Sequence, residues 1–198
     1  MKTSLPDETL KDWLARGVQG DEAACAALYA HFSPAIQRLV LGLLNDLADA
    51  EEVMQDTFVY AFRNLARYDS TKSAFSTWLF TIAISRSRNK RRRKWLALFP
   101  LEALTGAALE NAPREVEDVL ERRGIRRQVW AALQNVSPRL REAVALRFIA
   151  GMRYKEIGEA LDCNPKTAES RVRLGLEAMR EVLAAQGMEA EWAEMGAR

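Results

Sequence analysis

The sequence has little of what most enzymatic and metal sites require. It contains one histidine, His31, and two cysteines, Cys25 and Cys163, which lie far apart in the chain. Residues this isolated form neither a metal cluster nor a catalytic pair, so we interpret the cysteines as small, partly buried thiols rather than ligands or a disulfide. There is also no Gly-rich phosphate loop, nucleophile elbow or internal repeat. We therefore expect no metal, no cofactor and no enzymatic activity.

Long apolar runs and strand-like alternation are also missing. No run approaches the ~18 consecutive apolar residues of a membrane span, and residues 1–4 lead into no apolar signal core. We expect a cytoplasmic protein without membrane insertion. Apolar residues recur instead at steps of three and four, which is the period of amphipathic helices. The predicted fold class is all-α.

Charge is distributed unevenly, although the formal net charge is only +2. Residues 1–62 carry ten acids against four bases, and residues 63–95 carry one acid against ten bases. Residues 96–122 carry six acids against two bases, and residues 123–183 carry twelve bases against seven acids. Two basic blocks separated by an acidic stretch indicate two surfaces that face a polyanion.

The acidic first part predicts helices with a clear buried face. The stripe from Leu28 to Leu44 contains Pro34, which predicts either a kink or a break between two helices. In the next helix Asp49 can serve as N-cap, with Glu52 completing a capping box. Its outward side chains fit either a solvated helix start that suits the macrodipole or a docking face for a basic partner. They are Asp49, Glu51, Glu52, Gln55 and Asp56.

The first basic block forms the end of a predicted helix that begins at Phe75, after a polar loop from Tyr68 to Ser73. Arg86 to Lys94 holds seven bases in nine positions. A helix C-terminus favours cations, but this density exceeds what a solvated face needs, so nucleic-acid contact is the better interpretation. Aromatic faces beside a basic track can stack the bases of a single strand. The candidates just upstream are Tyr68, Phe75, Trp78 and Phe80.

The second half is predicted to be a separate helical domain. Residues 96–112 have no sustained period and read as a flexible linker. Beyond it, one helix ends at Ser137 and the next buries Leu146 together with Phe148 or Ile149. We therefore predict two small helical domains, residues 1–95 and 113–185, followed by a C-terminal tail of residues 186–198.

A helix-turn-helix is predicted from Tyr154 to Leu183. Asn164 is a good N-cap and Pro165 suits the first helical position, so the second helix begins there. Asp162, in the turn, tolerates a positive φ. The second helix of such a motif presents its N-terminal side chains to the major groove, although a similar pair also occurs in plain bundles. Those side chains are Lys166, Thr167, Glu169, Ser170, Arg171 and Arg173.

With both blocks read, the chain resembles bacterial RNA polymerase sigma factors of the extracytoplasmic-function type. Four stretches carry the resemblance, in the family's order and spacing. They are GDEAA (20–24), DAEEVMQDTFVYAF (49–62), FSTWLFTIAISRSRNKRRRK (75–94) and VSPRLREAVALRFIAGMRYKEIGEALDCNPKTAESRV (136–172). The second resembles region 2.2, which docks on the clamp helices of the largest subunit of core polymerase. The third resembles regions 2.3 and 2.4, which melt and read the minus-10 element, and the fourth resembles region 4, which reads minus-35.

The resemblance implies three sets of site residues and three partners. The partners are core RNA polymerase, promoter DNA and an anti-sigma factor, and the free protein is expected to be a monomer. The polymerase set consists of the five acidic and amide side chains of residues 49–56 named above. The minus-10 set is Tyr68, Lys72, Ser85, Arg86, Arg88, Asn89, Lys90, Arg91, Arg92 and Arg93; the minus-35 set is Lys166, Thr167, Glu169, Ser170, Arg171 and Arg173.

Two departures from the family pattern bear on base preference. Ser85 replaces an asparagine that contacts the promoter strand in many relatives, and Glu169 stands at a usually basic position. A carboxylate there can still accept a hydrogen bond from a cytosine amino group. The alternative function is a helix-turn-helix regulator that never joins polymerase. The acid-faced helix and the aromatic-and-basic helix favour the initiation factor, because a simple regulator needs no strand-melting half.

Overall fold

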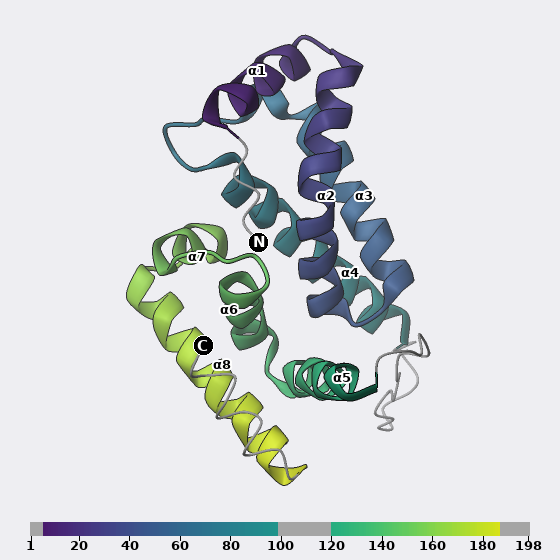
Figure 1. The fold of residues 1–198 in the computed structure, drawn as a ribbon, viewed down its shortest axis with the longest axis vertical. Helices are drawn as coiled ribbons and strands as arrows, with labels where there is room; N and C mark the ends of the chain where they lie inside the picture. Colours follow the sequence, from purple (N-terminus) through teal and green to yellow (C-terminus); the bar gives the residue numbers. More distant parts are fainter. Residues whose placement is uncertain (1–5, 99–119, 187–198) are drawn as a thin grey trace.

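The structure, a computed structural model, describes residues 6–98 and 120–186, and within these ranges it contains helices and no strands. The first half consists of α1 (Asp7–Val18), α2 (Glu22–Leu44), α3 (Leu47–Arg63), a short 3-10 helix (Leu65–Arg67) and α4 (Phe75–Leu98) (Figure 1). The second half consists of α5 (Leu120–Asn135), α6 (Pro138–Phe148), α7 (Tyr154–Leu161) and α8 (Pro165–Ala185). The predicted all-α class is confirmed.

The start of α3 differs from the prediction. Asn45 ends α2 in the left-handed region, with φ of 53°, and Asp46 caps α3 by accepting a hydrogen bond from the Asp49 backbone N–H at 2.9 Å. Asp49 is therefore inside the first turn and is not the N-cap, and the predicted capping box with Glu52 does not form. The two-residue turn explains the shift, because α3 must begin as soon as α2 has reversed direction.

Other boundaries also moved. Pro34 lies inside the continuous helix α2, so the predicted break is wrong. Helix α4 extends to Leu98, which takes residues 96–98 out of the predicted linker. The rest of that linker, the predicted start of the second domain at residue 113 and the tail from residue 187 lie outside the described residues. Of the two alternatives in α6, Ile149 packs on the core, whereas Phe148 is 62% exposed.

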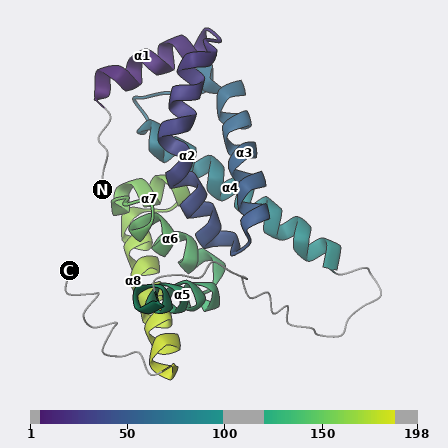
Figure 2. The same cartoon turned by 45° about the vertical axis from the view of Figure 1, so that its right-hand side comes forward.

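The two halves pack against each other rather than standing apart. One apolar cluster includes Leu28 and Phe75 from the first half and Leu146 and Ile157 from the second. Helices α6 and α7 lie beside α2 and α4, while the C-terminal end of α4 projects beyond the bundle (Figure 2). The contact is tight at Gly42 of α2, where a Cβ atom would come within 2.8 Å of the Trp130 ring and of Ile149 Cδ1.

Backbone groups of α2 also bind the second half through hydrogen bonds. Gln134 Nε2 donates to the Gly42 carbonyl at 2.9 Å, and Arg141 Nη1 donates to the Leu43 carbonyl at 3.2 Å. These are the last carbonyls of a helix, which have no partner within the helix itself. Side chains of the second half therefore supply hydrogen-bond donors to two of the unpaired carbonyls at the C-terminus of α2.

Candidate nucleic-acid and polymerase interfaces

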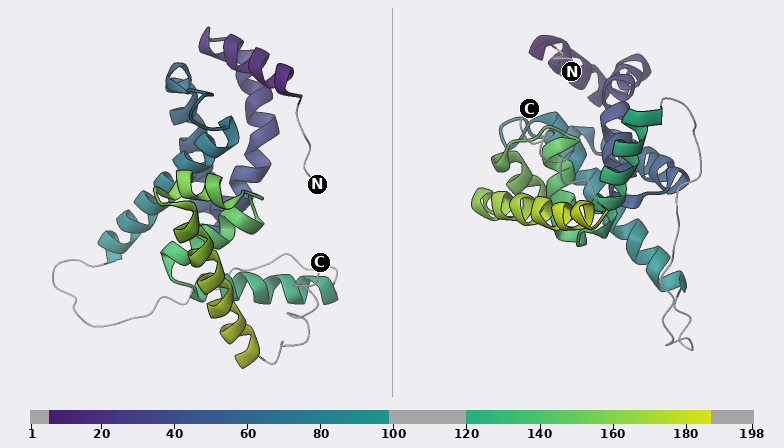
Figure 3. Two further views of the ribbon diagram at one scale, coloured as in Figure 1. Left: turned by 90° about the vertical axis from the view of Figure 1, so that its left-hand side faces the viewer. Right: turned by 60° about the horizontal axis from the view of Figure 1, so that its bottom comes forward.

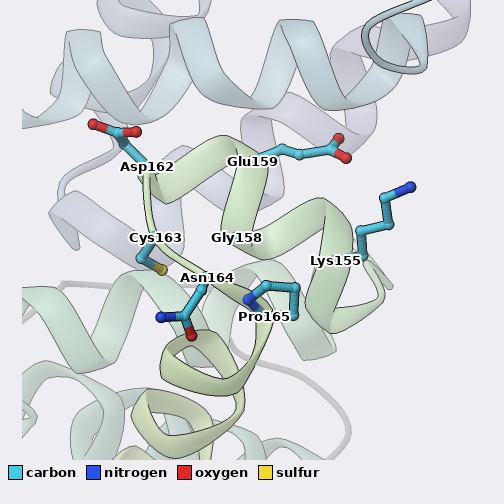
Figure 4. A pocket seen from close by; sticks show the side chains of 7 residues that line it. All are labelled: Lys155, Gly158, Glu159, Asp162, Cys163, Asn164 and Pro165. Carbon is cyan, nitrogen blue, oxygen red and sulfur yellow. The ribbon is translucent and has the colours of Figure 1, made fainter.

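The helix-turn-helix forms as the sequence predicts. Asp162 adopts φ of 52°, and Asn164 Oδ1 accepts a hydrogen bond from the Thr167 backbone N–H at 2.7 Å. Pro165 occupies the first position of α8. The turn borders an open pocket, shown in Figure 4. Its lining residues are Lys155, Gly158, Glu159, Asp162, Cys163, Asn164 and Pro165.

The turn is close-packed against α7 at Gly158. A Cβ atom on Gly158 would lie 2.6 Å from the Cys163 backbone oxygen. Gly158→Ala is therefore expected to destabilise the second half by about 1–3 kcal/mol, despite the better helix propensity of alanine, because a backbone atom must move. Thermal unfolding followed by circular dichroism measures the loss.

Gly175→Ala is the matched comparison for this prediction. A Cβ on Gly175 would also be too close to a neighbour, but that neighbour is the Val144 methyl Cγ2, at 2.5 Å. A side chain can shift slightly where a backbone oxygen cannot move without distorting the turn, so this variant should lose less stability than Gly158→Ala. Equal losses would show that the turn backbone is not what excludes a side chain at Gly158.

The predicted minus-35 residues lie along the first turns of α8. Lys166, Glu169, Ser170 and Arg173 are exposed, whereas Thr167 and Arg171 are half-buried. Three of the set already have side-chain contacts within the chain: Ser170 Oγ donates to the Lys166 carbonyl at 2.9 Å, and the other two are arginines. The Arg173 guanidinium pairs with Glu177 at 2.7 Å, and Arg171 Nη1 lies 3.5 Å from Cys163 Sγ. The pair with Glu177 is on the surface, so it is a weak competitor for a phosphate or a base edge.

The predicted polymerase residues on α3 divide into two groups. Glu51, Gln55 and Asp56 are exposed, and no hydrogen bond or ion pair occupies their side chains within the described part of the chain. Asp49 and Glu52 instead bind lysines of α4. The same helix also carries exposed apolar residues that were not predicted as part of a site, Leu47 at 59% and Val59 at 49% exposed.

One face of α4 is held by α3. Arg86 stacks over the Tyr60 ring, with its guanidinium carbon 4.7 Å from the ring centroid. Lys90 pairs with Glu52 at 2.5 Å and with Asp49 at 3.3 Å, and Lys94 pairs with Asp49 at 2.9 Å. These three cations recur every four residues, so they form one stripe along the helix.

The charges in this stripe reinforce one another. The hydrogen bond to Glu52 raises the pKa of Lys90, and the hydrogen bond to Asp49 raises the pKa of Lys94. Both lysines therefore stay charged. The run of cations on α4 was the basis for predicting DNA contact, but these two cations stabilise the packing of α4 on α3.

A second face of α4 is held by the other half of the protein. Arg88 Nη2 donates to Glu142 Oε2 at 2.6 Å, and Arg91 Nη2 donates to Glu142 Oε1 at 2.8 Å. The Glu142 side chain, on α6, is only 3% exposed. Glu142 was not predicted as a site residue, although its spacing from the buried Leu146 and the partly buried Ile149 (i, i+4, i+7) indicates that it shares their face.

The remaining predicted minus-10 residues of α4 lie at or near the surface. Ser85, Arg92 and Arg93 are exposed, and Asn89 is half-buried. Within residues 6–98 and 120–186, neither Arg92 nor Arg93 forms an ion pair. Both lie within the last two turns of α4, whose C-terminal end projects beyond the bundle (Figure 3). Among the described residues Arg86 has no acidic partner either, but its guanidinium is stacked over the Tyr60 ring, whereas Arg92 and Arg93 have neither kind of contact.

The aromatic residues before the basic run differ in how deeply they are buried. Phe75 and Phe80 are 1% and 5% exposed, so they belong to the core and are not available for stacking on bases. Tyr68 is half-buried, with its ring centroid 5.2 Å from Phe75 and 5.4 Å from Trp78. Its hydroxyl donates to the Ser73 carbonyl at 3.0 Å, and burial raises its pKa. In the same loop Lys72 is exposed and lies 3.7 Å from Asp69.

The part of the chain that the structure describes offers neither a membrane span nor a metal site. None of those helices is both long enough and apolar enough to cross a bilayer. No group of three or more His, Cys, Asp or Glu side chains in those residues could hold a metal ion. Cys25 and Cys163 are half-buried free thiols, as predicted.

A helix-turn-helix on one half and a cation-rich helix on the other define a DNA-binding protein of the all-α class. Comparison with known proteins gives the family. Residues 28–97 match the family model "Sigma-70 region 2", and residues 126–179 match "Sigma-70, region 4". The chain belongs to the sigma-70 family of RNA polymerase sigma factors, and to its extracytoplasmic-function (ECF) type.

Individual relatives agree with this assignment. The ECF RNA polymerase sigma factor SigK of Mycobacterium tuberculosis H37Rv is 32% identical over 174 residues, which are 87% of this chain and 92% of SigK. CnrH, solved with the cytosolic domain of CnrY, superposes with a TM-score of 0.67 at 22% identity, over 89% of this chain and 98% of CnrH. RpoE of Bartonella quintana, solved with the anti-sigma factor NepR, superposes with a TM-score of 0.65 at 21% identity. The match covers 80% of this chain and 96% of RpoE.

Proposed function

We propose that this sigma factor binds core RNA polymerase through α3, melts and reads the minus-10 element with α4 and the loop before it, and reads minus-35 with α8. Residues 1–95 would act as the region 2 domain and residues 113–185 as the region 4 domain. The protein would catalyse no reaction itself, because the polymerase makes the bonds. It supplies sequence recognition and strand opening.

The observation that carries this proposal is the pairing of two different DNA-facing surfaces on one chain. Helix α8 presents Lys166, Ser170 and Arg173 at the start of a correctly capped recognition helix, as a major-groove reader does. Helix α4 carries exposed Arg92 and Arg93, and the half-buried Tyr68 precedes it. Tyr68 packs on Phe75 at the start of α4, and Arg92 lies about 25 Å further along the helix at ~1.5 Å per residue. A single strand that runs along α4 would contact both the aromatic ring and the cations.

The direct test is reconstitution with purified core polymerase. The protein should co-elute with core polymerase in gel filtration, and the holoenzyme should start specific transcripts on genomic DNA that core polymerase alone does not start. Sequencing their 5′ ends should yield two shared upstream elements. Failure to join core polymerase, with retained binding to duplex DNA, would identify a regulator that acts without polymerase.

We also propose that an anti-sigma protein controls this factor. The support is that RpoE was solved with an anti-sigma factor and CnrH with the cytosolic domain of CnrY. The test is to isolate proteins bound to tagged sigma factor in its own cells and to add each purified candidate to the reconstitution. A true partner should block holoenzyme formation at stoichiometric amounts. A captured protein that leaves transcription unchanged is not the anti-sigma factor.

A further inference from the structure

The interface between the two halves contains a buried carboxylate held by cations from the other half. Glu142 of α6 is 3% exposed, and it accepts hydrogen bonds from Arg88 and Arg91 of α4. Arg88 also donates through Nε to both carboxylate oxygens, at 3.1 and 3.2 Å. Both oxygens are thus saturated by charge-assisted bonds, which are the strong class of hydrogen bond. Glu142 is the acid that joins the DNA-binding helix α4 to the second half.

The cations at this interface are less well satisfied than the carboxylate. Arg88, Arg91 and Arg141 lie around the single charge of Glu142, and burial together with the charge of Arg91 lowers the pKa of Arg141 to about 10. Arg91 Nη1 and Arg141 Nε are buried without a hydrogen-bond partner. Unpaired buried N–H groups are unfavourable. This contact therefore carries surplus positive charge, and a polyanion can compete with Glu142 for the arginines of α4.

The closed arrangement does not fit a promoter under the proposed function, on which this inference rests. The minus-10 and minus-35 elements are about 25 base pairs apart, or about 85 Å at ~3.4 Å per base pair. In the structure α4 packs directly against α7, the first helix of the helix-turn-helix. One protein cannot place both helices on elements so far apart while they touch. The two halves must separate before both elements are read.

We propose that the free protein is autoinhibited by this contact: Glu142 acts as an intramolecular substitute for DNA phosphate, holds Arg88 and Arg91 of α4, and thereby keeps the two halves closed. Opening releases both arginines from the carboxylate and frees α7 and α8. Binding to polymerase and promoter replaces the carboxylate by phosphates, so the protein has low affinity for DNA until both partners are present.

Two substitutions weaken the closed state by unrelated means. Glu142→Gln keeps the side-chain volume and removes the charge that holds Arg88 and Arg91. Gly42→Ala places a methyl within 2.8 Å of the Trp130 ring and Ile149, across the interface, without touching a charged residue. Alanine also has a better helix propensity than glycine, so α2 is not weakened. If both variants bind DNA more tightly, the low affinity of the wild type is caused by the contact between the two halves and not by the local charge of Glu142.

The experiment measures the shape of the full chain and its affinity for DNA. Small-angle X-ray scattering gives the radius of gyration, and fluorescence anisotropy gives the affinity for a 30-base-pair duplex of arbitrary sequence. Both variants should show a larger radius of gyration than the wild type and bind the duplex three- to tenfold more tightly. Glu181→Gln is the control, because it removes the same charge from an exposed position of α8 and should change neither quantity.

The outcomes separate this proposal from the function on which it rests. Wild-type radius and affinity in both variants would overturn it, and so would expansion without tighter DNA binding. If Glu142→Gln loses helical content, the affinity for DNA is measured on Gly42→Ala instead. The double variant Arg88→Gln with Arg91→Gln, which breaks the same contact from the other side, then carries the scattering measurement and should expand. Neither measurement uses polymerase, so a wild-type protein that fails to join polymerase would refute the proposed function alone.

Discussion

Reversing two exposed charges on α3, with Glu51→Arg and Asp56→Arg together, is expected to weaken binding to core polymerase at least a hundredfold. Both side chains are exposed, and neither forms an ion pair within the described residues. If α3 docks on a basic surface, each reversal turns an attraction into a repulsion, and like charges facing each other across an interface cost several kcal/mol. Arginine is a good helix former, so the helix itself should persist. Gel filtration and a competition assay against wild-type protein measure the loss.

The choice of residues follows from the structure. Glu52 is also in the predicted polymerase set, but it binds Lys90, so its reversal would disturb the α3–α4 stripe as well as any docking surface. The control is the double variant Glu22→Arg with Glu181→Arg. It makes the same change in net charge at two exposed positions away from α3. It should bind core polymerase as the wild type does. Wild-type binding by the α3 variant would place the docking surface elsewhere.

The second large effect is expected at Tyr68. Tyr68→Ala should reduce open-complex formation ten- to a hundredfold, which is about 1.4–2.8 kcal/mol. Extracting a base from the duplex costs a few kcal/mol, and one stacking partner returns ~1–3 kcal/mol. The ring of Tyr68 is half-buried beside Trp78, so part of it remains accessible to a flipped base. Permanganate footprinting of the melted region measures the fraction of open complexes.

The structural role of Tyr68 requires its own controls, because its ring also contacts Phe75 and its hydroxyl donates to Ser73. Tyr68→Phe loses only the hydrogen bond and keeps the ring, so it should open promoters almost as the wild type does. Tyr68→Ala should retain core and minus-35 binding. On promoters with an abasic site at each minus-10 position in turn, the wild type and Tyr68→Ala should become equally poor at one position. A penalty that persists at every position would make Tyr68 structural and place the pocket elsewhere.

Local chemistry was readable in the sequence wherever neighbouring residues decide the conformation. Asn164 caps α8, Pro165 starts it, and Asp162 adopts the left-handed conformation, as predicted. The prediction failed at α3, where Asp49 and Asp46 are both competent caps. Which one is used depends on where α2 ends, and a capping pattern does not contain that information.

Long-range pairing is what the tertiary structure decided. The run of bases from Arg86 to Lys94 is uniform in sequence, yet Lys90 faces α3, Arg88 faces Glu142 and Arg92 faces solvent. The helical period fixes which bases share a face, but only packing decides what each face meets.

The all-α class, the helix-turn-helix and the family could be predicted from the sequence, because apolar periodicity, caps and motif order are local or one-dimensional properties. The packing of the two halves, the place of Phe80 in the core and the burial of Glu142 against Arg88 and Arg91 became visible only in the folded chain. The physical reason is that the energy of a buried charge depends on partners about 50 residues away in sequence, as the separations of 54 and 51 for these pairs illustrate. A sequence pattern does not place such partners in space.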